Sequence, residues 1–235
     1  YSHGGAVVET ENAYVKADIV IVSPELSSRV TNVEVEDNQY VKKGALLFGM
    51  EHAGYVVEKQ RAQAQMDMVR ADVSALKAEY QASQIEKDEV RSMIIFYKKQ
   101  LERQVTLQEH GMGRADQYDE AFHRLELAKA RLMTLDKKSQ QVLANLLGNP
   151  RLDPQNHPKY LEATASFDRA DLGIKDSFVY APTSGIVSNM KLQAGEYVNR
   201  GTSIFSIIAS DRLWIEANFK ETQLTWMEVG QDVEI

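Results

Sequence analysis

Apolar residues in the middle of the chain recur at alternating spacings of four and three residues. From about residue 53 to 108 there is no Pro, and no Gly after Gly54. The members of the series are Ala62, Met66, Val69, Val73, Leu76, Tyr80, Ser83, Lys87, Val90, Ile94, Tyr97 and Leu101. This spacing places its members on one side of an α-helix and is typical of the seam of a coiled coil, here interrupted by two polar residues. We therefore expect one long helix.

A second series with the same spacing lies between two clusters of turn residues, at 110–113 and 148–150. Its members are Tyr118, Ala121, Leu125, Ala128, Leu132, Leu135, Ser139, Val142 and Leu146. A third, shorter series follows a loop rich in Pro, Asn and Asp. It consists of Tyr160, Ala163, Phe167, Ala170 and Ile174. The second and third helices together nearly match the first in length, so we expect an antiparallel coiled-coil hairpin over residues 52–175, with its tip near 109–114 and a break near 148–157.

Two segments on either side of the predicted hairpin repeat one pattern. Residues 29–48 and 186–205 both alternate apolar and polar side chains, as short β-strands do. At an offset of 157 residues the identical pairs are Val30/Val187, Asn32/Asn189, Tyr40/Tyr197, Val41/Val198, Gly44/Gly201 and Phe48/Phe205. One copy of about 30 residues is too small to bury a core. We expect residues 17–51 and 176–210 to form one sandwich, with turns at Gly44, Gly185 and Gly201.

The two ends of the chain also contain short alternating segments. Residues 213–219 and 231–235 have the pattern of strands, and residues 13–15 are a candidate for another. We interpret residues 211–235 as the start of a β-barrel and residues 1–16 as a linker with a possible barrel strand. The predicted fold class is α+β: a β-sandwich split by a long antiparallel α-helical coiled-coil hairpin and followed by a partial β-barrel.

Composition excludes several classes of function. With 43% hydrophobic and 26% charged residues the chain is in the globular range, and its net charge of −7 argues against nucleic acid as a partner. Without Cys there is no disulfide and no thiolate site, and the five His residues have no metal-ligand spacing. We find no catalytic arrangement, so we expect no enzyme, cofactor or metal. The longest apolar runs are far shorter than the roughly 20 residues that span a bilayer, but a membrane anchor could precede a chain that does not begin with Met.

Three short motifs carry a resemblance that covers nearly the whole chain. They are the segments at residues 10–15 (TENAYV), 181–187 (APTSGIV) and 217–223 (ANFKETQ). Together they resemble the HlyD/EmrA branch of periplasmic membrane fusion proteins. The resemblance implies that the sandwich is lipoyl-like and that its copies pack into a ring. It also implies a periplasmic adaptor between an inner-membrane transporter of the major facilitator type and a TolC-type outer-membrane channel, working in multidrug efflux. The expected location is the periplasm of a Gram-negative bacterium, with an N-terminal inner-membrane anchor outside this chain.

The resemblance also implies a docking site at the hairpin tip. Family members that dock on a TolC-type channel resemble one another in an Arg, a Leu four residues later and a Ser seven residues further. Arg103 and Leu107 match this spacing, whereas Arg114 stands in the place of the Ser. With Arg114 in this place, the contact of the serine hydroxyl is not available in the same form. From the spacing alone, the favoured interpretation is that Arg103 is a solvated charge on the helix and Leu107 a seam residue near a turn; the resemblance in architecture favours docking.

Other functions remain open at this point. Export by type I secretion or of aromatic acids needs the same architecture, and the heptads alone suit a structural coiled-coil rod. A lipoyl or biotinyl carrier is a more distant alternative, because Met190-Lys191-Leu192 is similar to a biotin-type motif. At the offset of 157, however, Lys191 matches Glu34, which we expect inside a strand. In addition, the hairpin that would present the modified lysine is replaced by the helices.

Overall fold

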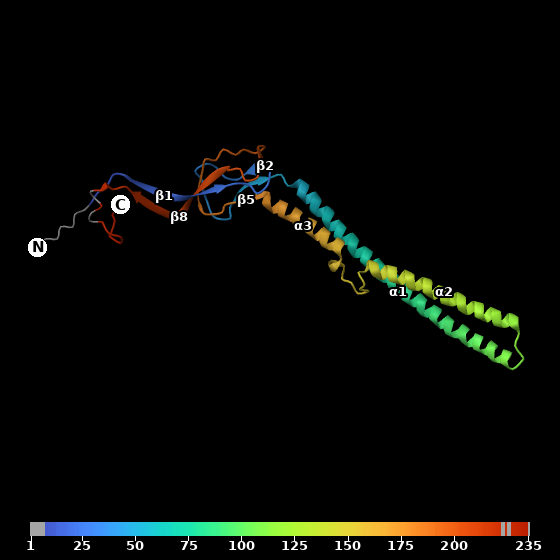
Figure 1. The fold of residues 1–235 in the computed structure, drawn as a ribbon. Helices are drawn as coiled ribbons and strands as arrows, with labels where there is room; N and C mark the ends of the chain where they lie inside the picture. The colour runs from blue at the N-terminus through green and yellow to red at the C-terminus, as the bar shows by residue number, and fades with distance from the viewer. Residues whose placement is uncertain (1–7, 222–223, 225–226, 235) are drawn as a thin grey trace. The chain divides into compact units, whose positions relative to one another are not determined.

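The computed structural model describes residues 8–221, 224 and 227–234 (Figure 1). Residues 57–170 form one compact unit, and the flanking segments form another. The elements in chain order are β1 (Ala13–Val22), β2 (Ser28–Val33), β3 (Tyr40–Val41), β4 (Leu46–Met50), α1 (Ala53–Glu109), α2 (Ala115–Asn145), η1 (Pro154–Asn156), α3 (Pro158–Asp176), β5 (Phe178–Tyr180), β6 (Gly185–Ser188), β7 (Tyr197–Val198) and β8 (Phe205–Ala217). The structure confirms the α+β class.

The strands form two four-stranded sheets that the internal repeat relates to each other. Their orders are β1-β8-β6-β3 and β5-β4-β2-β7, and the offset of 157 residues converts one order into the other. Backbone hydrogen bonds follow the same rule. The Val30 N–H donates to the Glu196 carbonyl (2.8 Å), and the equivalent Val187 N–H donates to the Gln39 carbonyl (2.9 Å). Each half of the chain therefore completes the hydrogen bonding of the other.

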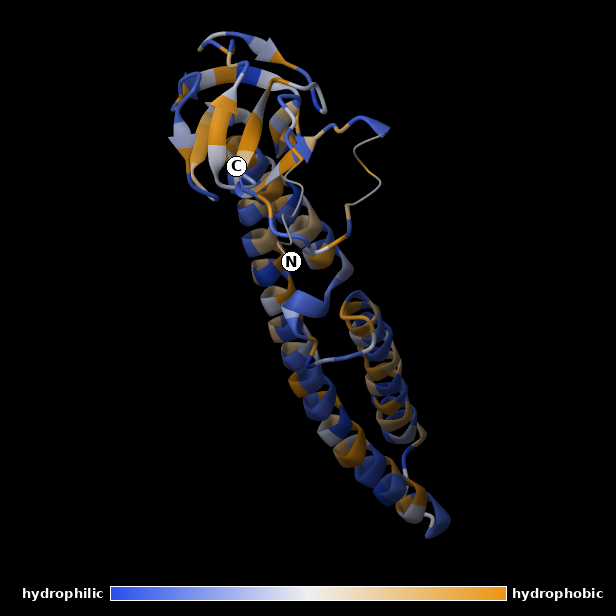
Figure 2. Cartoon of the chain, turned by 90° about the vertical axis from the view of Figure 1, so that its left-hand side faces the viewer, coloured by the Kyte–Doolittle hydropathy of each residue, from blue (hydrophilic) through white to orange (hydrophobic). Residues whose placement is uncertain are grey.

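The core of the sandwich is made of equivalent residues from both halves. Phe48 and Phe205, paired by the repeat, meet edge to face with ring centroids 6.2 Å apart. The buried residues of this cluster are Val22, Leu26, Val30, Val35, Val41, Leu47, Phe48, Met50, Ala181, Val187, Leu192, Val198, Phe205 and Ile207. In Figure 2 hydrophobic residues lie on neighbouring strands of the sandwich. Neither half encloses this core alone, as the size of one repeat predicts.

Two of the three predicted turn glycines have equivalent conformations. Gly44 has a φ of 83° and Gly201 a φ of 73°, values that only glycine adopts at little cost. Their N–H groups donate to the carbonyls of Ala181 and Pro24, which are themselves related by the offset of 157. The prediction for Gly185 is wrong, because this residue begins strand β6 and is buried. A side chain there would collide with the neighbouring strand, since an added Cβ would lie 2.1 Å from the backbone oxygen of Ile208.

The hairpin pairs α1 with α2 and then with α3 in the antiparallel sense. Gln84 donates to the Ser139 hydroxyl (2.7 Å), Lys87 pairs with Asp136 (2.5 Å), and Arg70 donates to the Tyr160 hydroxyl (2.6 Å). All six buried residues of α1 belong to the predicted seam: Ala62, Val69, Val73, Ser83, Lys87 and Val90. The seam prediction is therefore confirmed, including its two polar members.

The break in the returning strand of the hairpin begins directly after α2. The Gly148 N–H donates to the Leu143 carbonyl and the Leu147 N–H to the Ala144 carbonyl, both at 2.9 Å. This is the hydrogen-bond pattern of a Schellman motif, and it places Leu147 in the left-handed region (φ 55°). From the sequence we predicted that residues 148–150 end the helix. The left-handed residue of the motif, Leu147, comes one position before them.

The far end of the sandwich continues into a two-stranded ribbon. Strand β8 is continuous from Phe205 to Ala217, and its last residues pair with residues 13–17 of β1. Residues 231–234 are not a strand, contrary to the prediction for 231–235. Residues 1–7, 222–223, 225–226 and 235, which the predicted linker and barrel start include, lie outside the described residues. Among the described residues, no helix has both the length and the apolar character needed to cross a membrane.

Candidate docking site at the hairpin tip

The tip begins where α1 ends in a second Schellman motif. The Met112 N–H donates to the Leu107 carbonyl (2.9 Å), and the Gly111 N–H donates to the Gln108 carbonyl (3.0 Å). Gly111 supplies the left-handed conformation that the motif requires, with a φ of 70°. Two of the carbonyl groups that would be left without partners at the end of the helix, those of Leu107 and Gln108, are thereby satisfied.

The loop then passes close to the helix it has left. An added Cβ on Gly113 would lie 2.6 Å from the Cα of Gln108, so only glycine fits at this crossing without a shift of the backbone. The next residue, Arg114, has an extended conformation and precedes α2. Its guanidinium donates two hydrogen bonds to the Asp116 carboxylate, at 3.0 and 2.7 Å. Arg114 is therefore held by a partner within its own chain.

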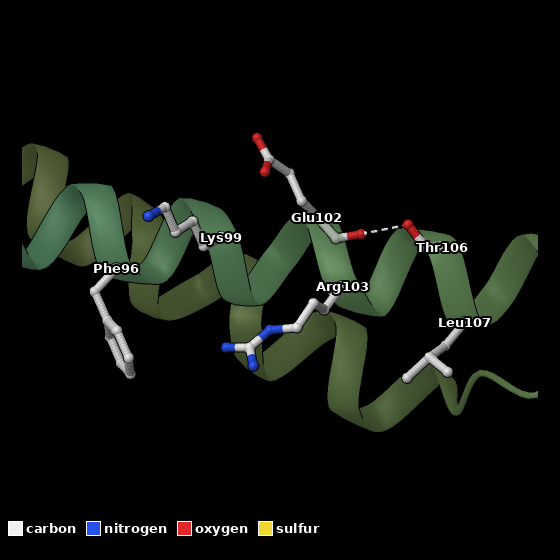
Figure 3. Close-up of a pocket in the computed structure, with 6 residues that line it drawn as sticks. All are labelled: Phe96, Lys99, Glu102, Arg103, Thr106 and Leu107. Carbon is white, nitrogen blue, oxygen red and sulfur yellow. Dashed lines mark hydrogen bonds between the residues drawn. The ribbon is translucent and has the colours of Figure 1, made fainter.

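A groove lies along α1 just before the tip. Its lining residues are Phe96, Lys99, Glu102, Arg103, Thr106 and Leu107. Figure 3 shows that Phe96, Arg103 and Leu107 extend from the same side of the helix, whereas Glu102 lies on another side. The Thr106 hydroxyl donates to the Glu102 carbonyl (3.0 Å), so it is occupied within the helix. The surface that faces outward thus combines one guanidinium with two apolar side chains.

The structure agrees with the simpler interpretation of Arg103, a solvated charge on the helix, but not with that of Leu107 as a seam residue. Within the described part of the chain Arg103 forms no hydrogen bond or ion pair, and it is exposed, so its planar fork of donors is available to another molecule. Leu107 is 39% exposed and is not one of the buried seam residues. The half-buried seam near the tip passes instead through Ile94, Tyr97 and Leu101.

The three residues that the family motif singled out do not line one site in the structure. Arg103 and Leu107 line one groove, but Arg114 is not among its lining residues and is paired with Asp116. Sequence reasoning missed Phe96 and Lys99. Phe96 could have been found from the sequence, because it is an apolar residue outside the seam. It also lies seven positions before Arg103, and residues seven apart in a coiled coil lie on the same side of the helix.

The carrier hypothesis needs one correction. Lys191 is exposed and lies after β6, not inside a strand. It follows Asn189, whose φ is 61°, and the Met190 N–H donates to the Asp37 carboxylate (3.1 Å). The other argument stands, because β4 and β5 are joined by the helices and no short hairpin links the halves.

Comparisons with known proteins point to one family. A family model described as "RND MFP, barrel-sandwich hybrid domain" matches residues 18–210. The chain is 28% identical over 236 residues to the multidrug export protein EmrA of Haemophilus influenzae, which covers 97% of this chain and 57% of that protein. It is 30% identical over 240 residues to the colistin resistance protein EmrA of Acinetobacter baumannii, covering 96% and 66%. The crystal structure of MacA from Actinobacillus actinomycetemcomitans has the same fold, with a TM-score of 0.53, 17% identity, and coverage of 96% of this chain and 64% of that one.

Proposed function

Because the chain belongs to the membrane fusion proteins of the HlyD/EmrA type, we propose that it is the periplasmic adaptor of a tripartite efflux system. The chain spans between 57% and 66% of the length of the two curated relatives described above. In the proposed system it bridges an inner-membrane transporter of the major facilitator type and a TolC-type outer-membrane channel. It self-associates into a ring, carries out no catalysis, and is anchored to the inner membrane by an N-terminal segment outside this chain.

The observation that carries this proposal is the surface of α1 next to the tip. Arg103, which is exposed and has no partner among the described residues, lies beside Leu107 and Phe96 on one side of the helix. Such a surface suits the ends of helices on another protein, because their free carbonyls and carboxylates accept from the guanidinium while the apolar side chains fill a small hollow. Phe96 extends the surface about 10 Å along the helix from Arg103, at 1.5 Å per residue.

The hairpin would act by reach and not by chemistry. Helix α1 has 57 residues, which corresponds to about 85 Å. In the proposed system this length would set the reach of the groove. The names of the two relatives, multidrug export and colistin resistance, support the removal of toxic compounds as the process that this adaptor serves.

The proposal is tested by reversing the charge of the free arginine. Arg103→Asp in the full-length adaptor should reduce drug resistance to the level of cells that lack the adaptor. The guanidinium donates hydrogen bonds to the channel in the proposed contact, whereas an aspartate carboxylate only accepts them. Resistance is measured as the inhibitory concentration of the exported drug, and adaptor abundance by immunoblot.

Lys98→Asp is the matched control. This lysine is also exposed on α1, five residues away, but it does not line the groove. The control should keep full resistance. If cells with a folded and abundant Arg103→Asp adaptor resist the drug normally, docking through this groove is wrong.

A further inference from the structure

A second groove lies between α1 and α3, apart from the one near the tip. Ala62 of α1 and Ala163 of α3 form its floor, and they are only 6% and 4% exposed. Because both floor residues have a single methyl group, the helices leave a hollow of about 660 Å³ above them. Sites for small organic molecules have volumes of roughly 300–1,000 Å³. The hollow, which we call the α1–α3 groove, is therefore large enough for such a molecule.

Charged side chains surround this floor. Three are cations: Arg61 on α1, and Lys159 and Arg169 on α3. Two are carboxylates, Glu58 and Glu162, so the rim carries one positive charge in excess. All five side chains are exposed, and none of them forms an ion pair or a hydrogen bond with another described residue. Their hydrogen-bonding capacity is therefore available to a ligand.

A comparison within α1 shows that this lack of pairing is not imposed by spacing. Asp67 and Arg70 are three residues apart and form an ion pair of 2.5 Å. Glu58 and Arg61 have the same spacing and the same order along the helix, but they do not pair. An exposed pair of this kind contributes little to stability. Arg61 therefore keeps its donors free at small cost, in a groove that Arg169 lines from the opposite helix.

We propose that the α1–α3 groove binds a small organic molecule that carries a phosphate group. The planar fork of a guanidinium donates two parallel hydrogen bonds to phosphate oxygens, and the groove offers one fork from each helix. A phosphate monoester carries more than one negative charge at neutral pH, which suits three cations accompanied by two carboxylates. A cationic ligand is disfavoured, because it would meet the excess positive charge of the rim.

The net charge of the whole chain does not decide the sign of the ligand. The chain has a net charge of −7 and repels anions at long range. At physiological ionic strength, however, charges more than about 8 Å away are largely screened. The excess positive charge of the rim therefore acts on a ligand inside the groove. The inference does not depend on the proposed function, because the α1–α3 groove shares no residue with the docking groove.

The test is calorimetric titration of the full chain with pyrophosphate, a soluble probe with two phosphate groups. Arg61→Gln with Arg169→Gln should weaken binding roughly tenfold or more, because both forks are lost. Arg124→Gln with Arg131→Gln is the matched control. It removes the same charge from exposed arginines of the hairpin that already have carboxylate partners, and should leave the affinity unchanged. Equal weakening by the two double variants would show a response to total charge alone and overturn the proposal.

A further double variant tests the sign of the charge that the groove selects. Glu58→Gln with Glu162→Gln should strengthen pyrophosphate binding, since it removes the two carboxylates and keeps the cations. If this variant binds pyrophosphate more weakly, or if the unchanged chain prefers the polyamine spermidine, the groove selects cations and the proposal is refuted. All the substituted side chains are exposed, so the circular dichroism spectrum should not change. Should the arginine variant fail to fold, the glutamate variant still decides the question.

A phosphate group can belong to a dissolved compound or to a lipid headgroup. Co-sedimentation of the chain with vesicles of phosphatidylcholine and phosphatidic acid in equal parts distinguishes the two, with vesicles of phosphatidylcholine alone as the control. Binding of pyrophosphate without binding to the vesicles identifies a dissolved ligand. Binding to the phosphatidic acid vesicles that Arg61→Gln with Arg169→Gln abolishes identifies a headgroup. If neither probe binds, the α1–α3 groove is not a phosphate site and the inference is wrong.

Discussion

Gly185 lies at a point where two strands of the sandwich approach each other closely. The repeat places Ser28 at the equivalent position of the other half. There the Ser28 hydroxyl donates to the Glu51 carbonyl (3.0 Å), so a side chain fits. In the second half, an added Cβ would lie 2.1 Å from the equivalent carbonyl, that of Ile208. The sequence repeat predicts that the residues at these two positions are interchangeable, but close packing in the sheet β1-β8-β6-β3 leaves no room for a side chain at Gly185.

We expect Gly185→Ala to lower the free energy of unfolding of the sandwich by about 1–3 kcal/mol, because the methyl group meets backbone atoms that cannot rotate away. The measurement is urea unfolding followed by tryptophan fluorescence. Gly54→Ala is the control, since that position has open space and lies in the first turn of α1. It should be neutral or raise stability by up to about 1 kcal/mol. Equal effects of the two substitutions would refute the close approach.

At the scale of the elements, the seam between α1 and α2 contains a polar layer. The stem of Lys87 is buried, and its ammonium reaches Asp136 at the edge of the seam. Beside it, Gln84 donates to Ser139. A buried polar residue in a coiled coil favours the one register in which its partner is present. This layer therefore fixes how far α2 is shifted along α1.

The layer predicts a dependence of hairpin stability on pH. The hydrogen bond from Lys87, and then its charge, lowers the pKa of Asp136. A carboxylate with a lowered pKa stabilises the folded state above its ordinary pKa, and this contribution is lost as the pH falls through the lowered value. Asp136→Asn should therefore be less stable than the wild type at pH 7, with the difference disappearing in acid. The measurement is the urea midpoint by circular dichroism at 222 nm between pH 7 and pH 2.

An exposed ion pair on the same helix serves as the comparison. Arg91 and Asp88 are both largely in solvent, so Asp88→Asn should change the midpoint little at any pH. A constant difference between Asp136→Asn and the wild type over the whole pH range would mean that the ion pair does not stabilise the hairpin.

At the scale of the whole molecule, a function based on reach depends on the length of the hairpin. Deleting residues 88–94 from α1 and 127–133 from α2 removes one heptad from each helix and keeps the phase of both seams. The hairpin shortens by about 10 Å at 1.5 Å per residue, while Arg103, Leu107 and the Lys87–Asp136 pair remain. We expect this variant to fold but to lose drug resistance, because the groove no longer reaches its partner. Inhibitory concentration and helicity are the measurements.

One heptad can be inserted into each helix at the same two positions, with apolar residues in the seam and polar residues elsewhere. This insertion should restore resistance, whatever the exact sequence of the heptads. If the shortened adaptor confers normal resistance without this insertion, the length of the hairpin is not what the system uses.

The sequence by itself determined the helices, their seam and the repeat, because each depends on spacing along one chain. Alternation of four and three residues places side chains on one side of a helix whatever surrounds it, and six identical pairs at one offset specify two copies of one unit. Arg103 and Leu107 were singled out only through the resemblance to a family motif, not by spacing alone.

Only the tertiary structure decided which of these residues are available to another molecule. In the described part of the chain Arg103 is exposed and has no partner, whereas Arg114 is paired with Asp116, although both are arginines near one turn. Gly185 belongs to a close strand contact and not to a turn. Ile186 and Ile208 lie opposite each other because strands distant in the sequence come into register. Pairing, close approach and exposure depend on neighbours in space, and no spacing along the chain encodes them.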